Sequence, residues 1–211
     1  MQGRHIVVTG GRGALGKGVV SVLEARGAIV HVTPDPPAFR LDDEAQATAF
    51  YAALPPLWAS IHLVGGFAMA PLADTTADAF EQQWRTNALT CFLSCREAVR
   101  AIRKTGAGGR IVNVSSRAAA QSSPGLAAYV AAKAAVSAMT QSLAAEVLAE
   151  RILVNAVLPS IIDTPANRAA MPNADFASWP KPTEIAETIA FLASPENTLT
   201  SGALVPVYGL G

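Results

Sequence analysis

Three side chains near the middle of the chain have the chemistry of a proton-transfer site. Tyr129 and Lys133 are four residues apart in an Ala-rich helical pattern, so their side chains point about 40° apart on one helix face. A phenol with its ordinary pKa of about 10 exchanges protons poorly near neutrality, but an ammonium one turn away lowers that pKa. Ser116 ends a predicted strand, where its hydroxyl is expected to bind the same substrate oxygen. The alternative is that Tyr129 and Lys133 have no catalytic role. They would then extend along the Ala-rich helix so that their polar ends reach water.

A glycine-rich segment, residues 9–16 (TGGRGALG), separates the first predicted strand from the first predicted helix. Gly11, Gly13 and Gly16 match the G-x-G-x-x-G pattern, in which bare backbone N–H groups approach a pyrophosphate. One alternative is an ordinary Gly-rich turn. Another is the G-x-x-x-x-G-K loop of nucleotide hydrolases, which needs Ser or Thr where this chain has Gly18.

The composition indicates a globular protein without a strongly charged partner. Of 211 residues, 51% are hydrophobic and 15% charged, which suffices for a large core and excludes disorder. Sixteen Lys and Arg balance sixteen Asp and Glu, so neither nucleic acid nor an anionic membrane is expected as a partner. Apolar stretches are too short to span a bilayer, and the first residues lack a signal-peptide pattern. We therefore expect a cytoplasmic protein that acts on a small molecule.

Strand and helix patterns alternate along the chain, as in a parallel sheet covered by helices. Strands are predicted at about residues 4–9, 28–33, 60–64, 110–115, 152–158 and 203–207, and helices at about 15–26, 43–53, 76–104, 124–150 and 183–193. Residues 163–182 contain four prolines and are predicted to form an irregular flap. With no repeat or linker in the sequence, residues 1–211 are predicted to form a single α/β domain.

The order and spacing of several motifs resemble the short-chain dehydrogenase/reductase family. Besides the loop at 9–16, they are VGG at 64–66, WRTN at 84–87, GRIVNVSS at 109–116, YVAAK at 129–133, VNAVLP at 154–159, DTP at 163–165 and SGALVPV at 201–207. The resemblance covers nearly the whole chain. It implies a Rossmann-like, doubly wound parallel sheet flanked by helices, an NAD or NADP cofactor, and hydride transfer to or from a small carbonyl or alcohol. It also implies a homodimer or homotetramer.

The resemblance assigns a catalytic tetrad of Asn87, Ser116, Tyr129 and Lys133. Tyr129 would be the general acid in reduction, and Lys133 would hold the nicotinamide ribose as well as tune Tyr129. Asn87 would order a water in the proton relay, and Thr164 would contact the nicotinamide carboxamide. The complete cofactor-binding set implied in this way is Gly10, Arg12, Gly13, Ala14, Leu15, Gly16, Asp35, Asp42, Val64, Gly65, Gly66, Asn87, Tyr129, Lys133, Pro159, Ile162 and Thr164.

Coenzyme choice stays open at the end of the second strand. The Asp that binds the ribose 2′-hydroxyl of NAD should stand there, but the chain has Pro34, followed by Asp35. Arg12 would receive the 2′-phosphate of NADP, and NAD is slightly favoured. Asp42 is either the acid beside the adenine or a helix N-cap.

Another departure lies in the loop itself. Ala14 replaces the family's middle glycine, and Gly13 is expected to supply the missing conformational freedom.

Within the family, three segments look like dihydropteridine reductase: residues 10–16, residues 158–168 and the flap residues 171–179. That branch lacks the catalytic serine, whereas this chain has Ser116. A serine suits a carbonyl or alcohol substrate, so carbonyl chemistry is favoured and pterin reduction is the alternative. A further alternative is that the protein is not an enzyme and only binds a dinucleotide.

No metal site is predicted. The three histidines, His5, His31 and His62, lie in or beside predicted strands at no metal-ligand spacing. Cys91 and Cys95 are four apart on a helix expected to be distant from them, and are predicted to be buried, reduced thiols.

Overall fold

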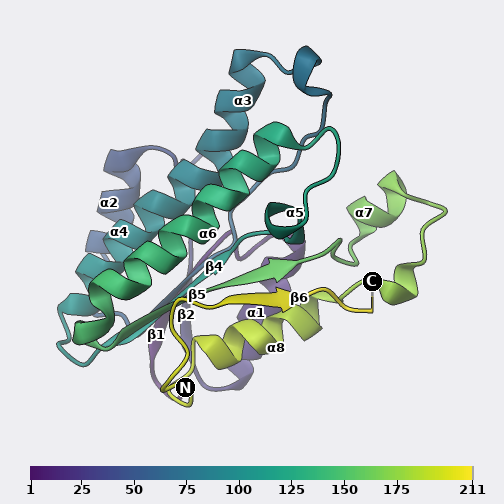
Figure 1. Ribbon diagram of the computed structural model, residues 1–211. Coiled ribbons are helices and arrows are strands. Elements are labelled where there is room, and N and C mark those ends of the chain that lie inside the picture. Colours follow the sequence, from purple (N-terminus) through teal and green to yellow (C-terminus); the bar gives the residue numbers. More distant parts are fainter. Residues whose placement is uncertain (211) are drawn as a thin grey trace.

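Six parallel strands form one sheet in the computed structural model, which describes residues 1–210 (Figure 1). The strands are β1 (His5–Thr9), β2 (Ile29–Val32), β3 (Ala59–His62), β4 (Gly109–Val114), β5 (Ile152–Pro159) and β6 (Leu204–Val207). Their order across the sheet is β2-β1-β3-β4-β5-β6, and each neighbouring pair is parallel. The order reverses between β1 and β3, which is the switch point where doubly wound sheets bind ligands.

Helices cover both faces of the sheet because successive apolar side chains of each strand point to opposite sides (Figure 1). On one face lie α2 (Glu44–Ala52), α4 (Thr90–Arg103) and α6 (Ala127–Val147), and on the other α1 (Ala14–Ala25) and α8 (Pro182–Leu192). In β1, Ile6 and Val8 join the core under α1 and α8, whereas Val7 joins the core under α4 and α6. The predicted α/β class and doubly wound sheet are therefore confirmed.

The helix predicted over residues 76–104 is not continuous. It consists of α3 (Ala77–Gln83), a π-helical segment (Trp84–Leu89) that we call the π-segment, and α4. Such wider turns are rare and often lie at functional sites. Here the π-segment contains Asn87, whose carbonyl and that of Thr86 accept hydrogen bonds from the Thr90 hydroxyl (3.3 and 2.8 Å).

Two other boundaries differ from the sequence prediction. The long Ala-rich helix begins at Ala127 rather than 124, because Gly125 has a left-handed φ of +77° and ends the preceding turn. A short helix, α5 (Arg117–Ala120), comes before it. The flap also contains a short helix, α7 (Pro165–Ala170), because Pro165 suits the first helical position after the cap Thr164.

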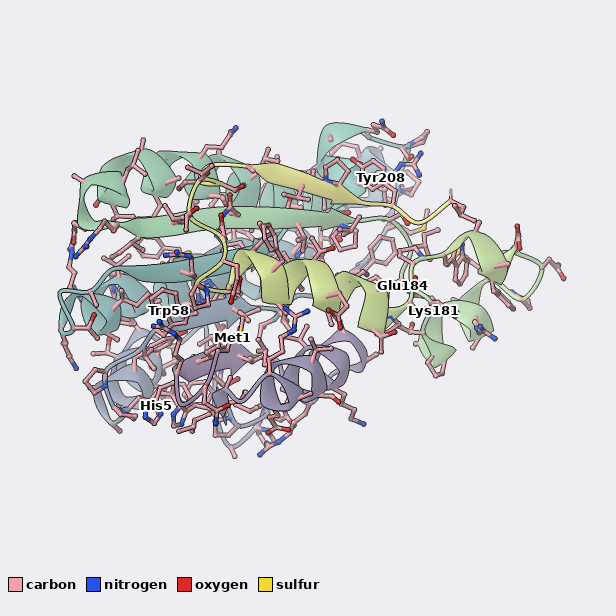
Figure 2. The ribbon with its side chains drawn as sticks, turned by 90° about the horizontal axis from the view of Figure 1, so that it is seen from below. Met1, His5, Trp58, Lys181, Glu184 and Tyr208 are labelled. Atoms are coloured by element: carbon pink, nitrogen blue, oxygen red, sulfur yellow. The ribbon has the colours of Figure 1, made fainter. Side chains whose placement is uncertain are left out.

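The carboxyl ends of the strands meet at one edge of the sheet, and the flap extends from this edge (Figure 1). Tyr208, just after β6, lies at this end, as do Lys181 and Glu184 at the start of α8 (Figure 2). His5 and Trp58 lie at the opposite end (Figure 2). No helix within residues 1–210 has the length and apolarity needed to cross a membrane.

Candidate active site

The glycine-rich loop forms a tight turn between β1 and α1. Gly10 has the left-handed φ of +69°, its N–H donates to the Thr33 hydroxyl (3.2 Å), and its carbonyl accepts from the Gly13 N–H (3.1 Å). A Cβ on Gly16 would lie 2.2 Å from the Gly10 carbonyl oxygen, so only glycine fits there. The first turn of α1 has no side-chain cap, which leaves its N–H groups available for an anion.

The conformational freedom expected of Gly13 is not used. Its φ of −67° is one that any residue adopts, and it serves as the N-cap of α1, with Ala14 as the first helical residue. The left-handed position is Gly10 instead. Ala14 is therefore tolerated because the turn is made four residues before it. Leu15 points toward the core under α1 and fixes the helix on the sheet.

Arg12 and Asp35 approach each other at the mouth of this loop. Their side chains form an ion pair with an N···O distance of 3.5 Å, and both are more than half exposed. The two residues expected to determine coenzyme choice therefore lie next to each other, although Arg12 follows β1 and Asp35 follows β2. A ligand that reaches it meets a cation and an anion together.

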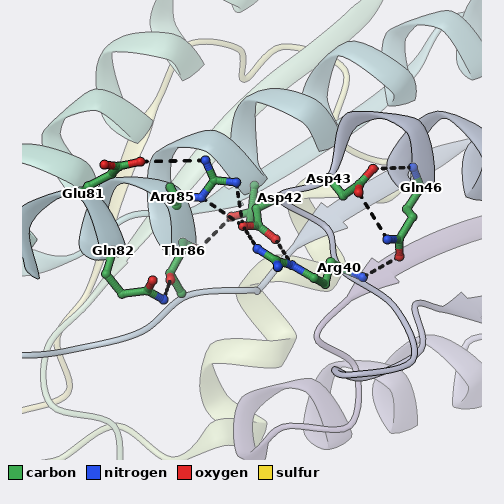
Figure 3. A network of polar contacts seen from close by, with 9 residues as sticks. Arg40, Asp42, Asp43, Gln46, Glu81, Gln82, Arg85 and Thr86 are labelled. Atoms are coloured by element: carbon green, nitrogen blue, oxygen red, sulfur yellow. Dashed lines mark hydrogen bonds and ion pairs between the residues drawn. The ribbon is translucent and has the colours of Figure 1, made fainter. Parts of the chain in front are cut away.

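Asp42 lies in a network of charged side chains, shown in Figure 3. Its carboxylate accepts hydrogen bonds from Arg40 (2.8 and 3.2 Å) and Arg85 (3.1 and 3.2 Å). The hydrogen bond from Arg40, assisted by Arg85, lowers the pKa of Asp42. The helix N-cap interpretation of Asp42 is wrong, because Asp43 caps α2 by accepting from the Gln46 N–H (3.0 Å). The network joins the segment before α2 to the π-segment.

Asn87 holds the backbone of the loop that follows β3. Its side-chain oxygen accepts from the Gly66 N–H (3.1 Å), and its amide donates to the carbonyls of Gly66 and Gln83 (both 3.0 Å). A Cβ on Gly65 would lie 2.8 Å from Asn87 Oδ1 and 3.1 Å from Lys133 Nζ, so both side chains converge on this glycine. The predicted ordering of a water by Asn87 stays a prediction, whereas its contacts to the loop are direct. Val64, at the start of this loop, packs on the small core below α2.

Ser116, Tyr129 and Lys133 come together beyond the end of β4. The Ser116 side chain lies close enough to Tyr129 to act on the pKa of its phenol, and its Oγ accepts from the Ala118 N–H (3.2 Å). Lys133 Nζ donates to the Val114 carbonyl (3.0 Å). The Ser115 hydroxyl donates to the Lys133 carbonyl (2.8 Å), which ties the end of β4 to α6. The predicted proximity of these three residues is thus present in the structure.

Burial governs the electrostatics of this trio. Desolvation raises the pKa of Tyr129, and the polar Ser116 side chain opposes that shift. Desolvation also lowers the pKa of Lys133 to about 8. The expected lowering of the Tyr129 pKa by Lys133 is therefore not found: burial and Ser116 are the causes of the shift. A raised pKa keeps the Tyr129 proton in place near neutrality, which suits a general acid.

The flap side of the site is built from the end of β5. Pro159 is the last residue of that strand and is buried, and Ile162 packs on the core under α1 and α8. The Ile162 carbonyl accepts from the Asn167 amide (2.8 Å), while the Thr164 hydroxyl accepts from the Asn167 N–H (3.2 Å) as the N-cap of α7. An ion pair between Asp163 and Arg168 (2.5 and 2.8 Å) closes this turn.

Comparison with known proteins decides the family. A family model described as enoyl-(acyl carrier protein) reductase matches residues 40–209. The chain is 31% identical to 3-oxoacyl-(acyl-carrier-protein) reductase FabG of Vibrio cholerae, over 99% of this chain and 97% of that protein. It is 28% identical to L-xylulose reductase of Bos taurus, over 99% and 96%. The chain is a short-chain dehydrogenase/reductase.

A solved short-chain type dehydrogenase/reductase from Mycobacterium ulcerans superposes with a TM-score of 0.92 at 24% identity, covering 100% of this chain and 90% of that one. This short-chain dehydrogenase/reductase therefore has the fold as well as the sequence features of its family. It is an NAD(P)-dependent oxidoreductase. The predicted family is confirmed, while the similarity to dihydropteridine reductase stays a prediction.

Sequence reasoning missed two aromatic contacts of this short-chain dehydrogenase/reductase. The Phe67 ring lies edge-on to the Tyr129 ring, with centroids 5.0 Å apart, and Phe67 is itself exposed. The Arg117 guanidinium lies over the Tyr208 ring at 5.0 Å. A signal was available for Phe67, since it directly follows the VGG motif. None was available for Arg117 and Tyr208, which are far apart in sequence.

The expectation that the cysteine helix is distant from the histidines is wrong. Cys95 Sγ lies 3.5 Å from His62 Nδ1, because α4 packs across β3 and its inward face meets the inward side chain of that strand. Cys91 and Cys95 are buried and reduced, as predicted. His5 and His31 pair with each other at the opposite end of the sheet (ring nitrogens 3.0 Å apart).

Proposed function

We propose that this protein transfers a hydride between a nicotinamide cofactor and the carbonyl or alcohol carbon of a small substrate, with Tyr129 as general acid and base. The observation that carries the proposal is the convergence of two side chains on the Tyr129 phenol. Ser116 acts on it from the end of β4, and Lys133 lies one helical turn along α6. Names of full-length relatives agree with carbonyl chemistry, since 3-oxoacyl and xylulose groups are both carbonyl compounds.

Each residue has a distinct task in this proposal. Ser116 donates to the substrate oxygen and places it beside the Tyr129 hydroxyl. Tyr129 gives its proton to that oxygen during reduction and takes it back during oxidation. Lys133 supplies positive charge beside the phenolate that reduction leaves behind. Asn87 keeps the loop at Gly65 and Gly66 in position for the approach of the cofactor ribose.

The residues of the glycine-rich loop fit a dinucleotide. Gly16 admits no Cβ, Gly11 would place one 2.8 Å from Val32, and the uncapped first turn of α1 offers N–H groups to a pyrophosphate. When bound, the nicotinamide supplies or accepts the hydride. We assign the pyrophosphate side to Gly10, Arg12, Gly13, Ala14, Leu15 and Gly16, and the nicotinamide side to Asn87, Lys133, Pro159, Ile162 and Thr164.

Coenzyme choice is expected to follow the Arg12–Asp35 pair, with NAD slightly preferred. Asp35→Ala removes the acceptor for a ribose hydroxyl, so we expect NADH to bind about tenfold more weakly, the cost of one charge-assisted hydrogen bond. NADPH binding should improve relative to NADH, because a repelling carboxylate is gone. Fluorescence titration of both reduced coenzymes measures this directly.

Arg12→Ala is the matched control for that titration. It should weaken NADPH, whose 2′-phosphate it would face, more than NADH. The assignment of Asp35 and the preference for NAD would be contradicted if the wild-type protein bound NADPH more tightly than NADH. In that case Arg12→Ala would lose the preference for NADPH and Asp35→Ala would keep it.

Ser116→Ala separates carbonyl reduction from pterin reduction. Loss of one donor to the developing oxyanion should lower kcat for aldehydes, ketones and 3-oxoacyl thioesters by about 100-fold. A quinonoid dihydropterin needs no such donor and should be reduced at an unchanged rate if it is a substrate at all. Steady-state oxidation of NADH or NADPH across this panel, with Ser122→Ala as an exposed serine control, gives the answer.

Wild-type turnover restricted to the pterin, insensitive to Ser116→Ala, would move the assignment to the pterin branch. Coenzyme binding without turnover of any compound in the panel would favour the catalytically silent alternative.

The substrate is proposed to have an apolar part. Phe67, Met69 and Leu72 follow the loop at Gly66 and are all exposed, and Phe67 touches the Tyr129 ring. Apolar side chains exposed beside a reactive phenol are expected to contact the carbon skeleton of the substrate.

A homo-oligomer is also proposed. Phe80, Trp84 and Phe92 extend along α3, the π-segment and α4 and are each more than 40% exposed, which is unusual for large apolar side chains. A second copy of this chain would cover them.

A further inference from the structure

Three metal-binding side chains converge in the core between α4 and the sheet, away from the coenzyme loop. His62 comes from β3, and Cys91 and Cys95 from consecutive turns of α4. Each is at most 6% exposed, and one ligand atom of each lies within 4.8 Å of the other two. The two Sγ atoms are 4.0 Å apart, and Cys95 Sγ is 3.5 Å from His62 Nδ1.

We propose that His62, Cys91 and Cys95 bind one thiophilic cation, Zn²⁺, through His62 Nδ1 and the two sulfur atoms. In tetrahedral zinc sites the Zn–S distance is about 2.3 Å and the Zn–N distance about 2.0–2.1 Å, which separates neighbouring ligand atoms by about 3.5–3.8 Å. The distances of 3.5 and 4.0 Å are already close to this spacing. Thiolate and imidazole are also the ligand types that zinc prefers over oxygen-only sets.

Asn113 offers the fourth ligand. Its Oδ1 lies 2.7 Å from His62 Nδ1 and 3.4 Å from Cys95 Sγ, so it borders the cluster; the hydrogen bond to His62 must lengthen for both atoms to bind one ion. Its amide donates to the Thr140 hydroxyl (2.9 Å), which keeps the oxygen directed at the cluster. A carbonyl oxygen completes a four-coordinate, closed site of the structural type.

The outer contacts are those that metal-bound histidines commonly make. His62 Nε2 lies 2.9 Å from Ser60 Oγ, which in turn lies 2.9 Å from the Tyr51 hydroxyl. Without metal, His62 carries its proton on Nδ1 and donates it to Asn113 Oδ1. When the metal binds Nδ1, the imidazole changes tautomer: the proton leaves Nδ1 and one binds Nε2. The Nε2–H group then donates a hydrogen bond to the Ser60 hydroxyl. Such a partner fixes the tautomer and the ring orientation.

Charge and protons balance in this step. The two thiols release two protons, the imidazole stays neutral, and the two thiolates neutralise the charge of Zn²⁺. A buried site of zero net charge avoids the large desolvation cost of an isolated ion.

The site would attach α4 to β3 and β4 next to the residues proposed for catalysis. Cys91 is one turn beyond Asn87 and is buried. Zinc would therefore stabilise the junction between the π-segment and α4 without contacting substrate.

The test is a titration of untagged, reduced wild-type protein with Zn²⁺ and with Co²⁺ as a spectroscopic substitute. We expect one tightly bound equivalent of zinc by native mass spectrometry. Cobalt should give a thiolate-to-metal charge-transfer band and the intense visible bands of a tetrahedral site. Cys91→Ala and Cys95→Ala should each weaken zinc by more than about 100-fold, beyond the 10–100-fold expected for the outer partner in Ser60→Ala.

Ser94→Ala is the matched control, since Ser94 is buried between the two cysteines on α4 and is not a ligand. It should bind zinc as the wild type does. Wild-type protein without a stoichiometric metal, or with cobalt bands typical of oxygen and nitrogen ligands only, overturns the proposal. The proposal is also overturned if the reduced protein binds no zinc and the protein forms a Cys91–Cys95 disulfide in air. These wild-type results decide the matter even if a cysteine variant does not fold.

Discussion

Tyr129→Phe is expected to lower kcat for carbonyl reduction by about 10²–10⁴-fold while leaving the dissociation constants of NADH and NADPH nearly unchanged. The substitution removes the proton donor and keeps the ring, so the edge contact with Phe67 and the packing of α6 persist. Ser116 keeps the hydrogen bond that its Oγ accepts from the Ala118 N–H. Steady-state kinetics combined with coenzyme titration separates the chemical step from binding.

Tyr208→Phe is the matched control for this experiment. Tyr208 lies at the same end of the sheet (Figure 2), and its ring lies against the Arg117 guanidinium, a contact that phenylalanine keeps. It should retain wild-type kcat within the scatter of the assay. A Tyr129→Phe enzyme as active as this control would show that the proton comes from another group.

Lys133→Met is expected to abolish most turnover and, below pH 8, to make the protein more stable. Burial lowers the pKa of Lys133 from its ordinary 10.5 to about 8, so holding the ammonium in the folded state costs at most about 3 kcal/mol. Methionine has a similar shape and no charge, and only the hydrogen bond to the Val114 carbonyl is lost. A net gain of about 1–2 kcal/mol is expected at pH 7.

The pH dependence of that gain has a definite sign. Between about pH 8 and 10.5 the unfolded chain binds more protons at Lys133 than the folded chain, so the wild type becomes relatively more stable as pH rises. The advantage of Lys133→Met should therefore be full below pH 8 and vanish between pH 8 and 10.5 as the burial cost disappears. At about pH 10.5 a small disadvantage should remain, because only the lost hydrogen bond to the Val114 carbonyl then counts. Urea unfolding across this range measures it.

Lys104→Met controls for the general effect of removing a lysine, since Lys104 is exposed at the end of α4. Its stability should follow the wild type at every pH. A Lys133→Met protein that is less stable than the wild type at pH 7 would mean that the buried ammonium is better solvated than its surroundings indicate.

The strands and most helices were predictable because their signals are local. Each strand of the sheet is a short apolar run rich in β-branched residues, and β5 is buried along all eight residues. The flap helix α7 was missed because its six residues carry no apolar period, and only Pro165 and the cap Thr164 specify it.

The site was predictable where spacing along one element determines geometry. Tyr129 and Lys133 share a helix face, and Ser116 ends a strand that must lie beside that helix. Interactions across elements were not predictable. The ion pair of Asp42 with Arg85 and the contact of His62 with Cys95 depend on how α4 and the π-segment sit on the sheet. A single sequence carries no periodic signal for such packing.

Transfer of deuterium tests the central proposal most directly. NADH and NADPH deuterated at C4 of the nicotinamide are incubated with wild-type enzyme and the carbonyl panel, and the alcohol products are analysed by mass spectrometry. We expect one deuterium on the former carbonyl carbon with wild-type enzyme, and a rate lower by about 10²–10⁴-fold with Tyr129→Phe. Two results would contradict hydride transfer at this site. One is an alcohol product that contains no deuterium, whichever of the two C4 hydrogens of the coenzyme was replaced. The other is that no carbonyl compound of the panel causes oxidation of NADH or NADPH.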